Sequence, residues 1–156
     1  MELTKERKNE RVKQIKVIEG YLRNYKNFKA GLSTMREQLE FIMPDITASY
    51  EVQEGTTGTF NIKSDTEKYA IDRIESKRAL VLHEDIARYE LIINSIKEAT
   101  ESLDDLEQEY VKLRYFERFT MQQVSIELGY SEKRIFNLRN EVMDKLLISL
   151  KGLLQL

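Results

Sequence analysis

The sequence predicts an all-α protein with long N-terminal and central helices and a helix-turn-helix near its C-terminal end. Glycine occurs 6 times and proline once in 156 residues, so the two strongest helix breakers are scarce. Apolar residues recur every three or four positions along most of the chain, which is the spacing of one helix face. Near the C-terminus, Gly129 separates two short stretches with this spacing, as is typical of a helix-turn-helix.

Composition narrows the possible functions. The chain has no cysteine, which excludes disulfides and thiolate chemistry, and its one histidine, His83, excludes a histidine cluster for zinc. No apolar run is long enough to span a bilayer, and the charged start lacks a signal peptide's apolar core. We therefore expect a cytoplasmic protein without membrane contact. No phosphate-binding glycine loop or nucleophile pattern occurs, so we expect neither an enzyme nor a cofactor.

The net charge of −2 conceals a strong segregation of charge along the chain. Residues 1–29 carry +5, residues 30–43 carry −1, residues 44–110 carry −9 and residues 111–156 carry +3. Contact with a polyanion depends on local patches rather than on the total charge. The two basic ends are therefore compatible with a nucleic-acid partner.

Residues 1–43 are predicted to form basic N-terminal helices. Helical spacing runs from about Thr4 to Lys29, and Gly31 is expected to break this helix. A shorter helix, roughly Ser33 to Met43, should follow and end at Pro44, because proline cannot continue a helix.

Residues 44–65 are predicted to be a flexible linker rich in Thr, Ser and Gly. Within it, "YEVQ" and "TFNIK" could instead pair around "EGTTG" as a small hairpin. We favour the linker because an isolated hairpin is only marginally stable in water.

Residues 66–101 are predicted to form one long central helix, started by the capping-box pattern of Ser64 and Glu67. Seven residues on it, or just beyond it, step alternately by four and three, which is a coiled-coil seam. They are Leu82, Ile86, Tyr89, Ile93, Ile96, Thr100 and Leu103. The seam either packs on the N-terminal helices or joins two subunits. Ser102, with Asp105, suggests a new helix cap, so the chain is expected to turn there.

Residues 102–156 form the last predicted domain, and its helix-turn-helix is the most informative part of the chain. A short helix carrying Leu106, Tyr110, Leu113 and Phe116 should precede it. Thr120 can then cap a helix together with Gln123, and Ser131 can cap a second one. Between them, Gly129 supplies the left-handed residue of the turn, and Tyr130 is expected to plug the corner.

The two faces of this motif have different compositions. The predicted inner face consists of Val124, Ser125, Leu128, Ile135, Leu138 and Val142. The predicted outer face of the second helix carries Ser131, Glu132, Lys133, Phe136, Asn137 and Asn140, flanked by Arg134 and Arg139. Such groups can donate to phosphates or to base edges in a major groove, so we predict that these eight residues bind double-stranded DNA. A helical hairpin that only packs usually shows Glu/Lys pairs on its outer face instead.

The stretch "LDDLEQEYVKLRYFERFTMQQVSIELGYSEKRIFNLRNEVMDKLL" resembles the fourth conserved region of bacterial sigma factors. The residues that carry the resemblance are Leu103, the "LRYFE" of 113–117, Thr120, Val124, Leu128, Gly129, Ser131, Ile135, Lys145 and Leu146. The resemblance covers about a third of the chain and implies a sigma-like DNA-binding domain. The layout of basic helix, linker, "SDTEKYAIDRIESKR" and sigma-like end resembles the ArpU/RinA-type phage transcriptional regulators. That resemblance implies activation of late phage genes in the bacterial host.

Two alternative functions remain open from the sequence. A phage small terminase subunit also joins a helix-turn-helix to helical oligomerisation elements. A helical protein-interaction module could bind host RNA polymerase without touching DNA.

A homodimer is the expected assembly. Glu141 and Asp144 interrupt the basic run in the second helix of the motif, so a single module should bind DNA weakly. Pairing two modules, through the central seam or the leucine-rich tail "LLISLKGLLQL", would raise the affinity.

Overall fold

The computed structural model describes residues 2–42 and 65–156 of the chain. Every regular element in these residues is a helix, which confirms the predicted all-α fold. The predicted linker, its hairpin alternative, and the expected helix end and start at Pro44 and Ser64 fall outside the described residues. None of the described helices is long and apolar enough to cross a membrane.

The chain forms two compact units. The first unit combines Met1–Lys29 with Glu90–Leu156, and the second is Ala30–Tyr89. Helices α2 (Tyr25–Ile42) and α3 (Asp65–Glu101) each contribute a segment to both units. The basic start of the chain therefore folds together with the helix-turn-helix region.

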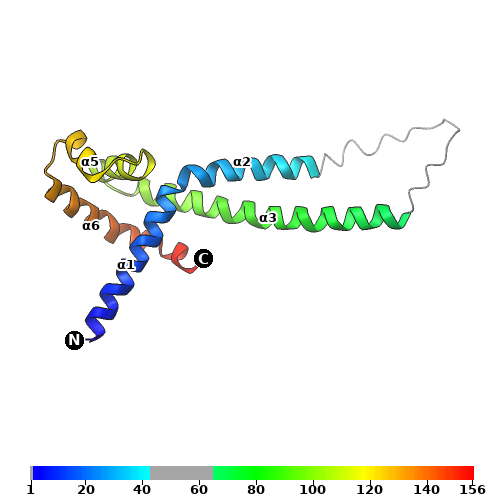
Figure 1. Ribbon diagram of the computed structural model, residues 1–156, viewed down its shortest axis with the longest axis horizontal. Helices are drawn as coiled ribbons and strands as arrows, with labels where there is room; N and C mark the ends of the chain where they lie inside the picture. The colour runs from blue at the N-terminus through cyan, green and yellow to red at the C-terminus, as the bar shows by residue number, and fades with distance from the viewer. Residues whose placement is uncertain (1, 43–64) are drawn as a thin grey trace. The chain divides into compact units, whose positions relative to one another are not determined.

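Helix α1 (Glu2–Arg23) ends earlier than expected. The turn falls at Asn24 rather than after Lys29. The prediction of one helix from Thr4 to Lys29 is therefore wrong about where that helix ends. The Asn24 side chain donates to the Gly20 carbonyl at 2.9 Å. It competes there with the Asn24 backbone N–H, which donates to the same carbonyl at 3.1 Å. Helix α2 begins directly after this residue (Figure 1).

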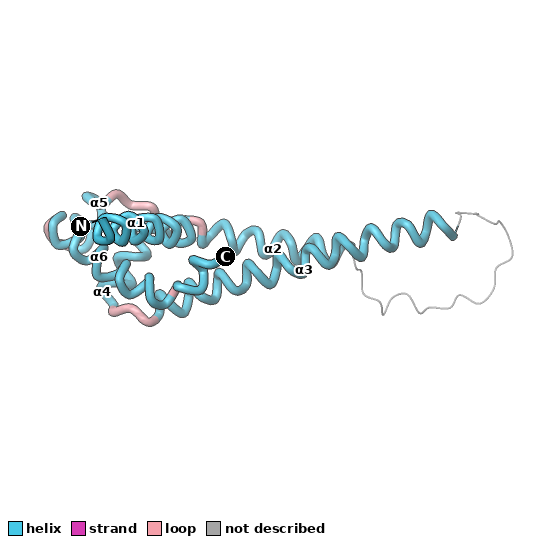
Figure 2. Tube along the Cα trace, turned by 90° about the horizontal axis from the view of Figure 1, so that it is seen from below, coloured by secondary structure: helices cyan, strands magenta, loops and turns pink. Residues whose placement is uncertain are grey.

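In the second unit, α2 and the first part of α3 run side by side, as both views show (Figure 2). Gly31 does not break α2, so this prediction is also wrong. A Cβ atom at Gly31 would lie 2.9 Å from Cε2 of Tyr89, which is too close. Glycine thus provides the space that the Tyr89 ring occupies, and this contact offsets the cost of glycine in a helix, about 1 kcal/mol.

The predicted coiled-coil seam on α3 is covered by the chain itself. Leu82, Ile86, Ile93, Ile96 and Leu103 are all buried within a single chain. Of the two interpretations of the seam, packing within one chain accounts for this burial without a second subunit.

The chain turns after α3, as expected, but the cap is not Ser102. The Ser102 hydroxyl donates back to the Ala99 carbonyl at 2.7 Å, so it is not available to cap the next helix. Asp104 is the residue before α4 (Asp105–Val111), and its backbone N–H donates to Oε2 of Glu107 at 3.0 Å. The predicted cap was therefore wrong by two residues.

Helix α4 continues into a π-helical turn, η2 (Lys112–Phe116), closed by a bond from the Glu117 N–H to the Lys112 carbonyl at 2.9 Å. The wider turn accommodates two fully buried tyrosines, Tyr110 and Tyr115, whose rings meet edge to face at 6.1 Å. Such a turn inserts an extra residue into a helix and re-aims the side chains around it. The predicted helix over Leu106 to Phe116 is present, with this irregularity.

The core of the first unit joins α1 to the C-terminal helices α5 (Met121–Leu128), α6 (Glu132–Ser149) and the short 3₁₀ segment η3 (Lys151–Gln155). Its fully buried members include Ile18, Leu22, Ile96, Tyr110, Val111, Tyr115, Val124, Ile135, Leu138, Met143 and Leu146. In the tail, Leu150 and Leu153 complete this core, whereas Ile148 and Leu156 are exposed.

Candidate nucleic-acid interface

Helix α5 begins at the predicted capping box. The Thr120 N–H donates to Oε1 of Gln123 at 2.8 Å, and the Gln123 N–H donates to Oγ1 of Thr120 at 3.2 Å. Two backbone donors that a helix start leaves without partners are thereby satisfied. The start of α5 is therefore capped by residues within the motif itself.

The turn between α5 and α6 has the predicted left-handed glycine and the predicted serine cap. Gly129 has φ 70° and ψ 28°, the left-handed conformation that glycine adopts without a steric penalty. The Tyr130 N–H closes the turn on the Ser125 carbonyl at 3.1 Å, and Ser131 Oγ accepts from the Arg134 N–H at 3.3 Å. Ser131 therefore caps α6. Tyr130 does not plug the corner, because its side chain is 45% exposed.

The predicted inner face is confirmed. Val124, Ile135, Leu138 and Val142 are fully buried, and Ser125 is also buried. The Ser125 hydroxyl donates to the Gln122 carbonyl at 2.8 Å, which satisfies this polar group inside the interface. Leu128 is half-buried beside them.

Six of the eight predicted DNA-binding residues are exposed together on α6 and its cap. They are Ser131, Glu132, Lys133, Phe136, Asn137 and Asn140. Phe136 leaves 51% of its surface open. The surface offers an ammonium group, two amides, a hydroxyl, a carboxylate and an aromatic ring on one helix.

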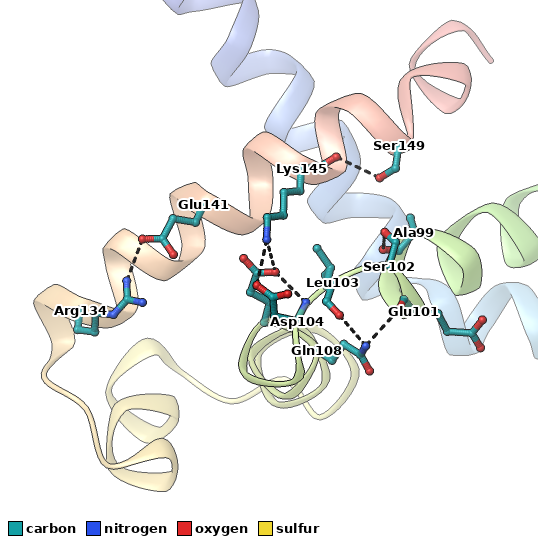
Figure 3. A network of polar contacts seen from close by, with 11 residues as sticks. Ala99, Glu101, Ser102, Leu103, Asp104, Gln108, Arg134, Glu141, Lys145 and Ser149 are labelled. Atoms are coloured by element: carbon teal, nitrogen blue, oxygen red, sulfur yellow. Dashed lines mark hydrogen bonds and ion pairs between the residues drawn. The ribbon is translucent and has the colours of Figure 1, made fainter.

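The seventh residue, Arg134, lies at the edge of this surface in an ion pair. Its Nη1 is 2.9 Å from Oε1 of Glu141, and Figure 3 shows this contact along α6. Asp144, the other acidic residue that interrupts the basic run, pairs with Arg11 of α1. Each of the two acidic residues thus has an arginine beside it, which reduces the repulsion they would exert on phosphates.

The eighth residue, Arg139, is placed apart from the others. Its Nη2 and Nε donate to Oε1 of Glu19 at 2.8 and 3.1 Å. The hydroxyl of Tyr115 donates to the same oxygen at 2.9 Å. Arg139 therefore connects α6 to α1 and η2 inside the unit, and the structure does not bring it to the outer face.

Burial and neighbouring charges shift the pKa values of Tyr115 and Arg139, the two partners of Glu19 described above. Burial raises the pKa of the Tyr115 phenol, and the neighbouring Tyr110 and Glu19 raise it further, so this tyrosine stays neutral. Burial alone would lower the pKa of Arg139, but the hydrogen bond and negative charge of Glu19 outweigh burial and raise it. The arginine is held in its charged form.

Sequence reasoning did not identify Glu19 and Tyr115 as structural partners of the motif. A signal was present, because Glu19 shares the helix face of Ile15 and Leu22, which are buried. A carboxylate in an apolar stripe needs a buried partner. The sequence alone does not show that this partner lies 120 residues away.

A second cluster fixes α6 against α4. Nζ of Lys145 lies 2.8 Å from Oε2 of the buried Glu107 and 3.3 Å from Oδ2 of Asp104 (Figure 3). The hydrogen bond that Lys145 donates to Glu107 raises the pKa of the Lys145 ammonium, and the second bond, donated to Asp104, adds to this. Nearby, Nε2 of Gln108 donates to the Leu103 carbonyl at 2.8 Å and closes the turn before α4. Among the described residues, no group of His, Cys, Asp and Glu is arranged to hold a metal ion.

Comparison with known proteins agrees with this geometry. Residues 99–146 match the family model described as Sigma-70, region 4, which covers about a third of the chain. A search of curated proteins and a search of solved structures both find no match. The matched segment contains α5, the glycine turn and α6 as far as Leu146. The chain therefore carries a DNA-binding helix-turn-helix of the sigma-70 region 4 type.

Proposed function

We propose that the protein is a sequence-specific regulator of transcription that binds double-stranded DNA through the outer face of α6. The observation that carries this proposal is the exposure of Lys133, Phe136, Asn137 and Asn140 on the second helix of a region 4-type helix-turn-helix. In this class of motif the second helix enters the major groove and its N-terminal half reads the bases.

Each exposed side chain has a chemical role in this proposal. Asn137 and Asn140 can pair with adenine, which presents one acceptor and one donor in the major groove. Phe136 can contact a thymine methyl group, and Glu132 can accept from a cytosine amine. Lys133 supplies a point charge to a phosphate at the groove edge.

The proposal includes that the protein activates late phage genes. It rests there on the layout of basic helix, central helix and sigma-like end, which resembles the ArpU/RinA-type regulators. Host RNA polymerase is the expected second partner, because a region 4-type module acts beside a promoter. In this proposal the protein regulates transcription and has no catalytic activity.

The proposal also includes a homodimer on two adjacent half-sites. The α3 seam is buried within the chain, so it no longer argues for a subunit interface. The proposal rests instead on the leucine-rich C-terminal tail, in which Ile148 and Leu156 are exposed. Two linked modules bind more tightly than one without any new base contact.

The test is selection of binding sites from a random pool of DNA duplexes, followed by fluorescence anisotropy over a salt series. The wild type should enrich a defined sequence. Asn137→Ala should relax preference at one base pair, a cost of roughly 1–3 kcal/mol. Lys133→Ala should weaken binding to all sequences and lower the salt slope by about one phosphate contact.

The matched control is Lys97→Ala, since Lys97 is exposed on α3 in the same unit but outside the helix-turn-helix. This variant should bind like the wild type. A Lys133→Ala, Asn137→Ala double variant that binds and selects like the wild type would refute the assignment of α6 as the reading helix.

A further inference from the structure

The first half of α1 carries a basic face that the helix-turn-helix alone does not include. Lys5, Lys8 and Arg11 are exposed and follow one another at intervals of three along the helix. Residues with this spacing lie on the same side of a helix. We propose that these three residues, here called the α1 basic face, bind the phosphate backbone of the DNA beside the groove that α6 enters. This inference rests on the proposed function.

The position of α1 relative to α6 is fixed within one compact unit. Arg11 pairs with Asp144 on α6, and Glu19 binds Arg139 one turn further towards the start of that helix. Ile18 and Leu22 are fully buried in the shared core. Helix α1 is therefore a fixed part of the DNA-binding unit and cannot be treated as a loose basic tail.

The helical register gives the direction of the basic face. Leu22, Ile18 and Ile15 are buried, and steps of four and three from Ile15 lead to Arg11 and Lys8. The face that packs on the core thus continues as a basic face where α1 extends past the core. Arg11 pairs with Asp144, which lies four residues after Asn140 on α6 and therefore on the same side of that helix as the predicted outer face.

Charge is sorted between the two sides of this helix. The opposite side carries Glu6, Glu10 and Lys13, which line a groove with Leu154 of the tail. Both acidic residues between positions 5 and 13 are on that side. Between positions 5 and 13 the α1 basic face therefore carries three positive charges on the side away from Glu6 and Glu10, and Arg11 pairs with Asp144 of α6.

The chemistry of the face fits phosphate oxygens. Ammonium groups act as point charges towards a phosphate, and a guanidinium has five donors in a fixed fork. Arg11 can keep its bond to Asp144 and still donate to a phosphate. Because such contacts do not depend on base sequence, they should add affinity on any duplex and should not change which site is selected.

The experiment measures binding to a mixed-sequence DNA duplex of several helical turns by fluorescence anisotropy over a salt series. Lys5→Gln with Lys8→Gln should lower the slope of log affinity against log salt by about 1.8, since each lost phosphate contact removes about 0.9. The matched control is Lys13→Gln on the opposite side of the same helix, which should leave the slope unchanged. Both lysines are exposed, so circular dichroism should show the same helix content in all variants.

Three results would overturn the inference, and they can be told apart. A wild-type slope in the Lys5→Gln, Lys8→Gln variant would show that the α1 basic face does not touch DNA. A loss of about 0.9 in Lys13→Gln, the same per charge as in the double variant, would show a general effect of charge without a face. A wild type that binds no DNA at all would overturn the proposed function together with this inference.

Discussion

Arg139 and Glu19 form an ion pair that joins α6 to the N-terminal helix α1, with Nη2 and Oε1 2.8 Å apart. The two residues are 120 positions apart in the sequence, and Tyr115 donates to the same carboxylate oxygen. The Glu19 side chain is 11% exposed and the Arg139 side chain 28%. This pair makes α1 an integral part of the unit that contains the helix-turn-helix.

Arg139→Ala should destabilise the protein by about 2–4 kcal/mol, because it leaves the buried Glu19 carboxylate with only the half-exposed Arg23 as a cation, 3.9 Å away. The loss is placed slightly below the ~3–5 kcal/mol typical of a fully buried pair, since Arg139 keeps some contact with solvent. Urea denaturation followed by circular dichroism measures the change.

The control for this prediction is the double variant Glu19→Leu, Arg139→Met. Replacing both charges with apolar side chains should recover part of the lost stability, since no buried charge is then unpaired, whereas the Tyr115 hydroxyl still loses its acceptor on Glu19. If Arg139→Ala melts like the wild type, the contact with Glu19 does not hold α1 in place.

Gly129→Val should destabilise the protein by at least about 1–2 kcal/mol, the cost of a left-handed conformation in a residue with a Cβ atom. No atom lies within 4 Å of a Cβ built at this position, so the cost is one of backbone strain only. Thermal melts give the change.

Gly129→Asn is the comparison that isolates backbone strain, because asparagine adopts the left-handed region more readily. It should melt between the wild type and Gly129→Val. An unchanged midpoint in the valine variant would mean that this turn has another conformation in solution.

The free energy of unfolding should fall as the pH rises above about 10. Burial raises the pKa of Tyr110 and Tyr115 above the ordinary 10.0, and the bond to Glu107 raises the pKa of Lys145 above the ordinary 10.5. A group whose pKa is raised on folding stabilises the protein below its unfolded pKa, and this contribution is lost at higher pH.

Ultraviolet absorbance of tyrosinate provides the readout for the alkaline transition. In the wild type, the Tyr110 and Tyr115 phenols should ionise only as the protein unfolds. A double variant, Tyr110→Phe with Tyr115→Phe, should lack this part of the absorbance change. Ionisation of both tyrosines in the folded protein would contradict their burial.

Light scattering at micromolar concentration should give a mass of about twice 18.5 kDa for the wild type. Ile148→Asp, on the exposed face of the tail, should shift the mass to that of one chain without loss of helix content. A wild-type mass of one chain would refute the homodimer, and eight or more subunits would favour a ring-forming terminase subunit. Substituting Ile86 or Ile93 by Asp is not a clean test, because both side chains are buried within the chain.

The sequence was most informative where structure depends on neighbouring residues. The capping box of Thr120, the left-handed Gly129 and the cap at Ser131 each depend on bonds within a few positions, and all three were predicted correctly. Gly31 was misread as a helix break because its role depends on Tyr89, which is distant in sequence. A glycine looks the same in a sequence whether it ends a helix or makes room for a ring.

In the candidate site, too, features set by neighbouring residues were predictable and those set by distant residues were not. Exposure of Lys133 and Asn137 follows from the helical period and was predictable. The inward position of Arg139 follows from a carboxylate on another helix, which no local pattern reveals. Charges that fit DNA and charges that fit a buried partner cannot be separated by composition.

Site-specific crosslinking tests most directly whether the outer face of α6 reads DNA. The chain has no cysteine, so a single cysteine at position 137 can carry a photoreactive group without competing sites. On the selected duplex, Asn137→Cys should crosslink to bases at one place in the major groove, and Lys97→Cys on α3 should not crosslink. Crosslinks from position 97 with none from position 137, on DNA that the labelled proteins still bind, would contradict the account.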